Sequence, residues 1–93
     1  MARLLLKGDE STVPNTVAAA SSFSEAPVAR LVNISTTTDY TVTIKETADA
    51  SATTIGSFTI LRGTSELIEK GPSQVVFVNA DTNVKGAKVG FTN

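Results

Sequence analysis

Hydrophobic and polar side chains alternate along most of the chain after residue 27, in short segments that end at turn residues. The clearest alternation covers residues 40–47, where Tyr40, Val42 and Ile44 share one face and hydroxyl or charged side chains occupy the other. A period of two residues with one apolar face is typical of a half-buried antiparallel strand. Turn residues recur about every 8–12 positions, which is the spacing of a β-sandwich or a small barrel.

The pattern predicts six or seven strands separated by turns. They cover residues 2–7, 28–34, 40–47, 53–61, 65–70, 74–79 and 84–91. A break in the period near Gly56 and Ser57 indicates a β-bulge, and residues 62–64 have the length of a hairpin turn. The side chains expected in the core are Val32, Tyr40, Val42, Ile44, Ile55, Phe58, Ile60, Val76 and Val78.

The first 27 residues follow a different pattern. Residues 2–7 are predicted to form a short strand, whereas residues 8–27 are small, polar and weakly patterned, with Pro14 and Pro27 disfavouring a helix just before each of them. We expect an irregular arm with at most one helical turn, a flexible tether that buries little. The prediction is one all-β domain, a small antiparallel β-sandwich of the immunoglobulin-like or jelly-roll-like kind. Residues 1–27 form its N-terminal strand and arm, and residues 28–93 form the sandwich.

Composition narrows the possible functions. The chain has 93 residues, with 8 Lys or Arg, 9 Asp or Glu, no His and no Cys, and its formal net charge is −1. This balance gives no broad positive field for nucleic acid or anionic lipid, so neither a nucleic acid nor a membrane is expected as a partner. Without His or Cys the commonest general base, the thiolate nucleophile and the usual zinc ligands are missing. We therefore predict a protein that is not an enzyme and that has no catalytic residues, no metal and no cofactor.

Two local features could have carried chemistry or targeting. Residues 79–83 offer Asn79, Asp81 and Asn83 at alternating positions, as calcium loops do, but they lack the central glycine and distal glutamate of such loops. An ordinary turn is predicted there. The leucine triplet at residues 4–6 ends at Lys7. It is too short for a signal peptide or a membrane span, which need about 7–15 and about 20 apolar residues.

Five segments resemble small proteins encoded in the structural gene blocks of tailed bacteriophages, marine phages of cyanobacteria first among them. They are Arg30-Leu31-Val32-Asn33, Thr41-Val42-Thr43-Ile44, TIGSFTI at residues 54–60, IEKGP at residues 68–72 and KGAKVGFT at residues 85–92. The resemblance covers residues 28–93, and residues 1–8 are also similar. It consists of strands and turns rather than a catalytic motif. It implies a virion component with a compact β fold, and it carries over no functional residues.

The resemblance and the lack of catalytic residues favour a protein that acts through its surface. The first hypothesis is a capsid decoration or cement protein, made in the host cytoplasm and bound to the outer surface of the phage head through the major capsid protein or another virion protein. The second hypothesis is a neck, tail or fibre-associated component of the same particle. The third is a cytoplasmic module that binds a protein or a glycan.

The N-terminal strand is the candidate subunit contact. Its residues place an apolar triplet between two cations, in the order Arg3, Leu4, Leu5, Leu6 and Lys7. A short apolar strand gains stability by adding to the edge of a neighbouring sheet. We therefore expect a homo-oligomer, a trimer, in which the arm crosses a subunit boundary, so that deleting residues 1–27 leaves a folded domain. The alternative is that the three leucines form the first strand of the chain's own sandwich.

Overall fold

Eight strands and one short 3₁₀ helix form the regular structure of residues 3–80 and 82–92, the part of the chain that this computed structural model describes. The strands are β1 (Arg3–Leu6), β2 (Ser11–Thr12), β3 (Val28–Asn33), β4 (Tyr40–Lys45), β5 (Thr54–Ile60), β6 (Ser65–Glu69), β7 (Val75–Val78) and β8 (Val84–Thr92), and the helix is η1 (Val17–Ala19).

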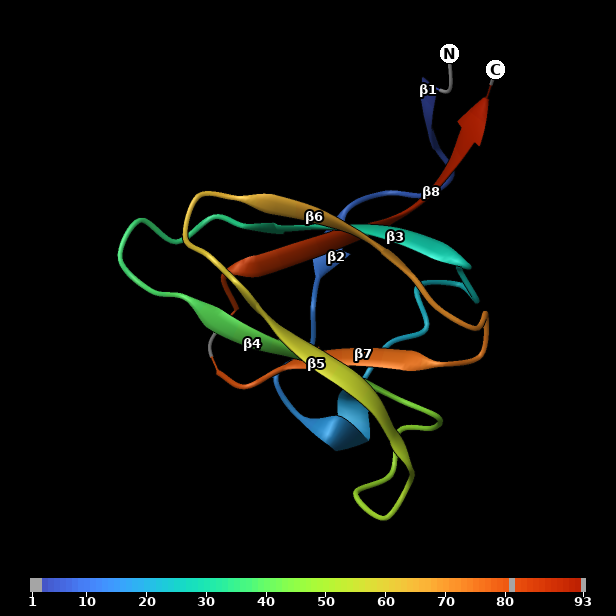
Figure 1. The fold of residues 1–93 in the computed structure, drawn as a ribbon, viewed down its shortest axis with the longest axis vertical. Helices are drawn as coiled ribbons and strands as arrows, with labels where there is room; N and C mark the ends of the chain where they lie inside the picture. The colour runs from blue at the N-terminus through green and yellow to red at the C-terminus, as the bar shows by residue number, and fades with distance from the viewer. Residues whose placement is uncertain (1–2, 81, 93) are drawn as a thin grey trace.

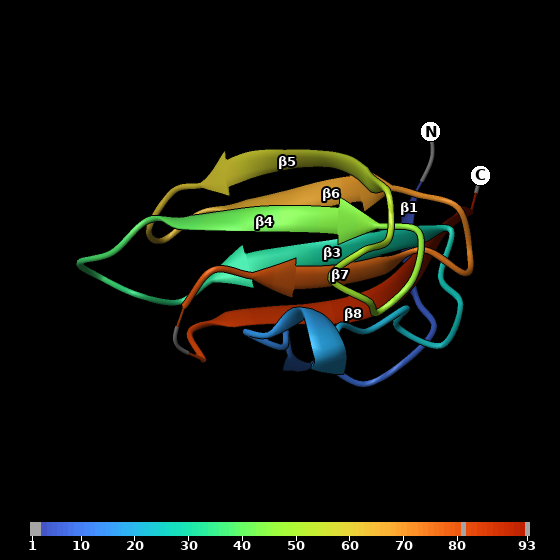
Figure 2. The ribbon, with the colours of Figure 1, turned by 90° about the horizontal axis from the view of Figure 1, so that it is seen from below.

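The strands form two sheets that pack against each other (Figure 1, Figure 2). The larger sheet has the order β1-β8-β3-β6, with β2 also paired to β8, and the smaller sheet has the order β5-β4-β7. Every pairing is antiparallel. In the described residues the three-residue η1 is the only helical segment. The predicted small antiparallel β-sandwich is therefore confirmed.

The core lies between the inner faces of the two sheets. Most of the side chains predicted for it on the smaller sheet are buried there, and two more are partly buried against it. The buried ones are Tyr40, Val42, Ile60, Val76 and Val78, and the partly buried ones are Ile44 and Phe58. The larger sheet contributes Ala29, Leu31, Ile68 and Val84.

The prediction that Val32 lies in the core is wrong, because β3 turns its other face inward. That inner face carries Ala29, Leu31 and Asn33, all 0% exposed, while Val32 is only partly buried. A buried asparagine is tolerated only when its polar atoms find partners. The Asn33 amide donates to two backbone carbonyls, at 2.9 and 3.1 Å, and its side-chain oxygen accepts the N–H of Ser35.

The prediction that Ile55 lies in the core is also wrong, and the β-bulge is the reason. Ile44 faces Gly56 and Lys45 faces Thr54, so Ile55 is the extra residue of β5 between these two pairs. An extra residue breaks the alternation of faces, and Ile55 is 48% exposed. The bulge itself lies next to Gly56, as the sequence predicted.

The turn at residues 62–64 does not close a hairpin, contrary to the prediction. β5 and β6 belong to different sheets, so this turn crosses from one layer to the other. Gly63 supplies the positive φ of 69° that the turn requires. Its N–H donates to the carbonyl of Asn33, and the carbonyl of Thr64 accepts the N–H of Asn33, which fixes the crossover to the end of β3.

Residues 8–27 are not the tether with little to bury that the sequence predicted. Val13, Phe23 and Ala26 are members of the core cluster. The backbone pairs with both sheets: β2 with β8 in the larger one, and Pro14 and Ser21 with β7 in the smaller one. Figure 2 shows η1 on the β7–β8 side of the sandwich, opposite β5 and β6. The arm therefore covers one side of the sandwich.

Candidate functional site

The N-terminal strand forms a two-stranded ribbon with the end of the chain. β1 pairs with β8 from Arg3 opposite Thr92 to Leu6 opposite Val89. β3 pairs with β8 only as far as Lys88, so the ribbon extends beyond the strand that supports the rest of β8. Figure 1 shows this ribbon projecting from the body of the sandwich. An isolated two-stranded ribbon is at best marginally stable in water, which makes this element a candidate contact.

All three leucines of the ribbon remain exposed. The exposed fractions are 43% for Leu4, 42% for Leu5 and 70% for Leu6. Because neighbouring residues of a strand point to opposite faces, Leu4 and Leu6 lie on one face and Leu5 on the other. Of the two alternatives set by the sequence, the structure addresses only the second, and the crossing of a subunit boundary stays a prediction. The leucines belong to a strand of the chain's own sheet, but they are not part of its core.

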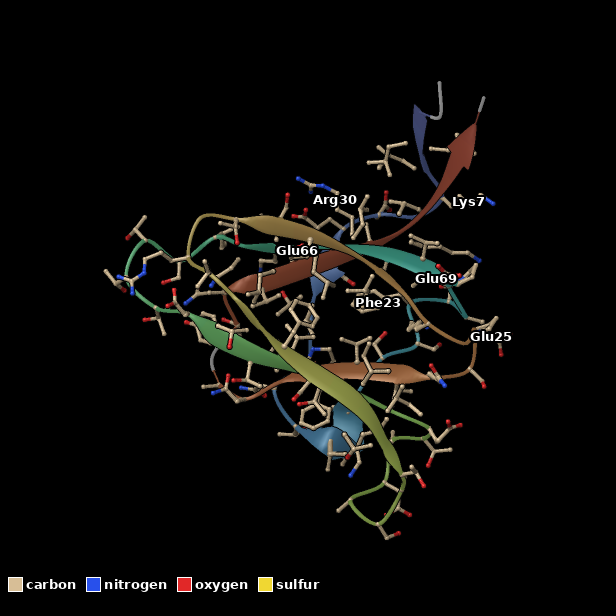
Figure 3. The ribbon with its side chains drawn as sticks, in the orientation of Figure 1. Lys7, Phe23, Glu25, Arg30, Glu66 and Glu69 are labelled. Carbon is tan, nitrogen blue, oxygen red and sulfur yellow. The ribbon has the colours of Figure 1, made fainter. Side chains whose placement is uncertain are left out.

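Lys7 lies at the base of the ribbon and packs along it. Gly90 leaves room for its aliphatic stem, since a Cβ added at Gly90 would lie 2.9 Å from Cε of Lys7. The Lys7 N–H continues the ladder by donating to the carbonyl of Lys88 at 3.0 Å. Figure 3 shows the side chain pointing away from the sandwich. Of the predicted contact residues, only Arg3 has a side chain outside the described part of the structure.

A strained turn anchors the arm to the body. Phe23, Ser24 and Glu25 have φ values of 53°, 57° and 56°, in the left-handed region that costs about 1–2 kcal/mol for each residue with a Cβ. The turn is closed by Ser22, whose carbonyl accepts the N–H of Ala26 and whose hydroxyl accepts that of Glu25. Such strain persists only where the surroundings hold the chain firmly.

The side chain of Phe23 supplies that hold. It is 6% exposed and lies between the two sheets in Figure 3. Gly86 of β8 leaves the space, because a Cβ added there would come within 2.7 Å of Cζ of Phe23 and 2.8 Å of Cδ2 of Leu31. No pattern in the sequence indicates this contact, since Phe23 stands alone among small polar residues without any period.

Two lysines hold the same turn by its carbonyls. Nζ of Lys70 donates to the carbonyl of Ser22 at 3.0 Å, and Nζ of Lys88 donates to that of Ser24 at 3.1 Å. Lys70 is only 7% exposed, and it also donates to the carbonyls of Gly71 and Pro72. Burial lowers the pKa of the Lys70 amine below its ordinary value, and the Lys88 ammonium nearby lowers that pKa further. Both amines therefore serve the structure of the turn.

A hollow of about 160 Å³ lies beside this turn, lined by Gly8, Asp9, Ser11, Ser21, Phe23, Ser24 and Lys88. The hydroxyl of Ser21 accepts the Phe23 N–H, and the Lys88 amine is engaged with Ser24. Serine is a weak nucleophile unless an adjacent base activates it. The hydroxyl of Ser21 and the amine of Lys88 are thus both used in hydrogen bonds that hold the arm in place.

In the turn at residues 79–83, which has the alternating oxygen side chains of a calcium loop, two side chains make hydrogen bonds within the fold. The side-chain oxygen of Asn79 accepts the N–H of Thr41, and the Asn83 amide donates to the hydroxyl of Tyr40. Asp81 lies outside the described residues. Among the residues that are described, no group of three or more Asp or Glu side chains is placed to hold a metal ion.

Comparison of the chain with protein families, with curated proteins and with solved structures finds no match. The described residues contain no helix with the length and hydropathy of a membrane span. The class that the fold defines is an all-β sandwich with a projecting apolar ribbon.

Proposed function

We propose that this protein is a non-enzymatic structural component of a tailed bacteriophage, a decoration or cement protein that binds the outer surface of the capsid. It is made in the host cytoplasm and is bound in the virion to the major capsid protein or another virion protein. Its resemblance to small phage structural proteins supports the proposal. So does the small sandwich fold, which is suited to a repetitive surface.

The exposed leucine ribbon is the observation that carries the proposal. Fully burying one leucine contributes about 1.5–3 kcal/mol, and the chain leaves three of them exposed on an element that its own core does not support. Many weak contacts of this size act together on a lattice of identical subunits. A homo-oligomer assembled through the ribbon fits the same observation, and the trimer expected from the sequence stays a prediction.

Copy number tests the proposal. Particles of the phage that encodes this chain are purified, and the protein is quantified by mass spectrometry against the major capsid protein. A number approaching that of the major capsid subunits is expected. A few copies per particle would instead favour the neck, tail or fibre-associated component, and absence from particles would favour the cytoplasmic module that binds a protein or a glycan.

Binding of purified protein to particles that lack it tests the role of the ribbon. Leu4→Ser with Leu6→Ser is expected to reduce binding at least about tenfold, because burial of the two side chains is lost. Leu61→Ser is the control, since Leu61 is 55% exposed and directly follows β5, which belongs to the other sheet. Equal binding by the ribbon variant and the control would contradict the proposal.

A further inference from the structure

We propose that β1 of one copy adds to the free edge of β6 in a second copy, so that the larger sheet continues from one subunit into the next. β1 and β6 are the two outermost strands in its order β1-β8-β3-β6. This inference deepens the proposed function and rests on that function in one respect, that β1 is a subunit contact. It does not depend on where the protein lies on a phage particle.

Each of these strands has one edge without a partner. β1 pairs with β8 and β6 pairs with β3, and no other described backbone segment hydrogen-bonds to the second side of either strand. An open edge presents a row of backbone N–H and C=O groups that can pair with another strand. The two edges also match in length, at four and five residues.

The two edges have opposite charge. Arg3 and Lys7 flank the leucines of β1, whereas β6 carries Glu66 and Glu69. Both glutamates are exposed, and Figure 3 shows them on β6 with Lys7 at the base of the ribbon. In the described part of the chain the one ion pair joins Arg62 to Asp39. Lys7, Glu66 and Glu69 thus have no ion-pair partner there.

The distribution of charge selects this pairing over the others. Like charges directly opposite each other destabilise paired strands, so β1 with β1 and β6 with β6 are both disfavoured. The edge of β5 is open as well, but β5 carries no charged residue and is interrupted by the bulge at Ile55. Bulges commonly protect an edge from pairing. The acidic edge of β6 is therefore the best complement of the basic edge of β1.

An antiparallel register brings the apolar residues together with the charges. The N–H of Lys7 points to β8 and that of Lys70 points to β3, so the free backbone groups belong to Leu4 and Leu6 on β1 and to Ser65, Leu67 and Glu69 on β6. With Leu4 placed opposite Leu67, Leu5 falls opposite Glu66. Arg3 and Lys7 then lie on either side of that glutamate, on the same face of the sheet. Leu67 is 49% exposed. This contact is head to tail, so it closes into a ring or continues as a filament. A closed ring of three copies would be the trimer predicted from the sequence.

Charge exchange tests the pairing with the full chain in solution. One variant carries Arg3→Glu and Lys7→Glu, and a second carries Glu66→Lys and Glu69→Lys. Sedimentation over a concentration series is expected to show self-association of the wild type, weakened at least about tenfold in each variant. Mixing the two variants restores it, because the acidic β1 of one then meets the basic β6 of the other. Added salt weakens the wild-type association.

The control is Glu46→Lys with Asp49→Lys, the same charge change in the connection between β4 and β5, where it should leave association unaltered. Far-ultraviolet circular dichroism establishes that each variant is folded. A wild type that stays monomeric, charge variants that associate as the wild type does, or a mixture that fails to recover would each overturn the inference. Absence from phage particles would overturn the proposed function alone, because sedimentation reports on the edge contact without them.

Discussion

The two parts of the N-terminal segment differ in burial, in the opposite sense to their hydrophobicity. Residues 3–6 include three leucines, and each of these is at least 42% exposed. Residues 8–27 are mostly small and polar, yet three of their side chains, Val13, Phe23 and Ala26, are buried in the core. The difference lies in what the sandwich offers to each part. Gly86 leaves a space for Phe23. By contrast, β1 pairs with the part of β8 that follows Lys88, the last residue of β8 that pairs with β3.

The largest effect is expected where the arm enters the core. Phe23→Ala should lower the free energy of unfolding by about 3–5 kcal/mol, because it empties a closed space between the sheets. Leu6→Ala is the matched change in the ribbon and should cost less than about 0.5 kcal/mol, since Leu6 is exposed. Urea unfolding of the two variants measures both values, and similar losses would remove the distinction between arm and ribbon.

A smaller loss is expected on the receiving side of the same contact. Gly86→Ala adds a methyl group where two ring carbons of Phe23 and Cδ2 of Leu31 already lie within 3 Å. Overpacking of this kind costs about 1–3 kcal/mol. Combining Gly86→Ala with Phe23→Ala should cost less than the sum of the two single changes, because the space left by the ring accommodates the new methyl group. Additive losses of stability would show that the effect of Gly86→Ala does not come from its contact with Phe23.

How far the sequence predicts this molecule depends on periodicity. Strands such as β4 can be predicted from the sequence, because Tyr40, Val42 and Ile44 alternate with polar residues. The arm has no period, so nothing in the sequence shows that Phe23 fills the core. The inner face of β3 includes Asn33, whose side-chain amide donates a hydrogen bond to the carbonyl of the distant Ile60, and this bond forms only when the sheets meet.

The candidate contact was predictable in part for the same reason. The leucine triplet between two cations stands out in the sequence, and the structure leaves those leucines exposed. The acidic edge of β6 was not predictable as a complement. Which strands end up outermost in a sheet is a property of the topology, which places β1 and β6 at opposite edges.

A modest pH effect is expected from Lys70, on the arm side of the comparison. Its folded pKa is lowered by burial and by Lys88, so above that pKa the unfolded chain binds more protons than the folded one. The free energy of unfolding should therefore rise as pH increases toward the ordinary lysine pKa of about 10.4. Lys70→Met should flatten this rise, while Lys7→Met in the ribbon should not. If the free energy of unfolding rose equally with pH in both variants, Lys70 would not be the source of the pH effect.

Truncation at two points tests most directly whether β1 is a contact strand rather than a core strand. The sequence alone predicted that removing residues 1–27 leaves a folded domain; the structure predicts that it does not, because Val13, Phe23 and Ala26 are lost from the core. Removing only residues 1–7 should leave the melting temperature within about 4 °C of the full chain, equivalent to less than about 1 kcal/mol, while self-association and particle binding disappear. A shortened chain that unfolds, or one that still associates as the full chain does, would contradict the assignment of β1 as the contact.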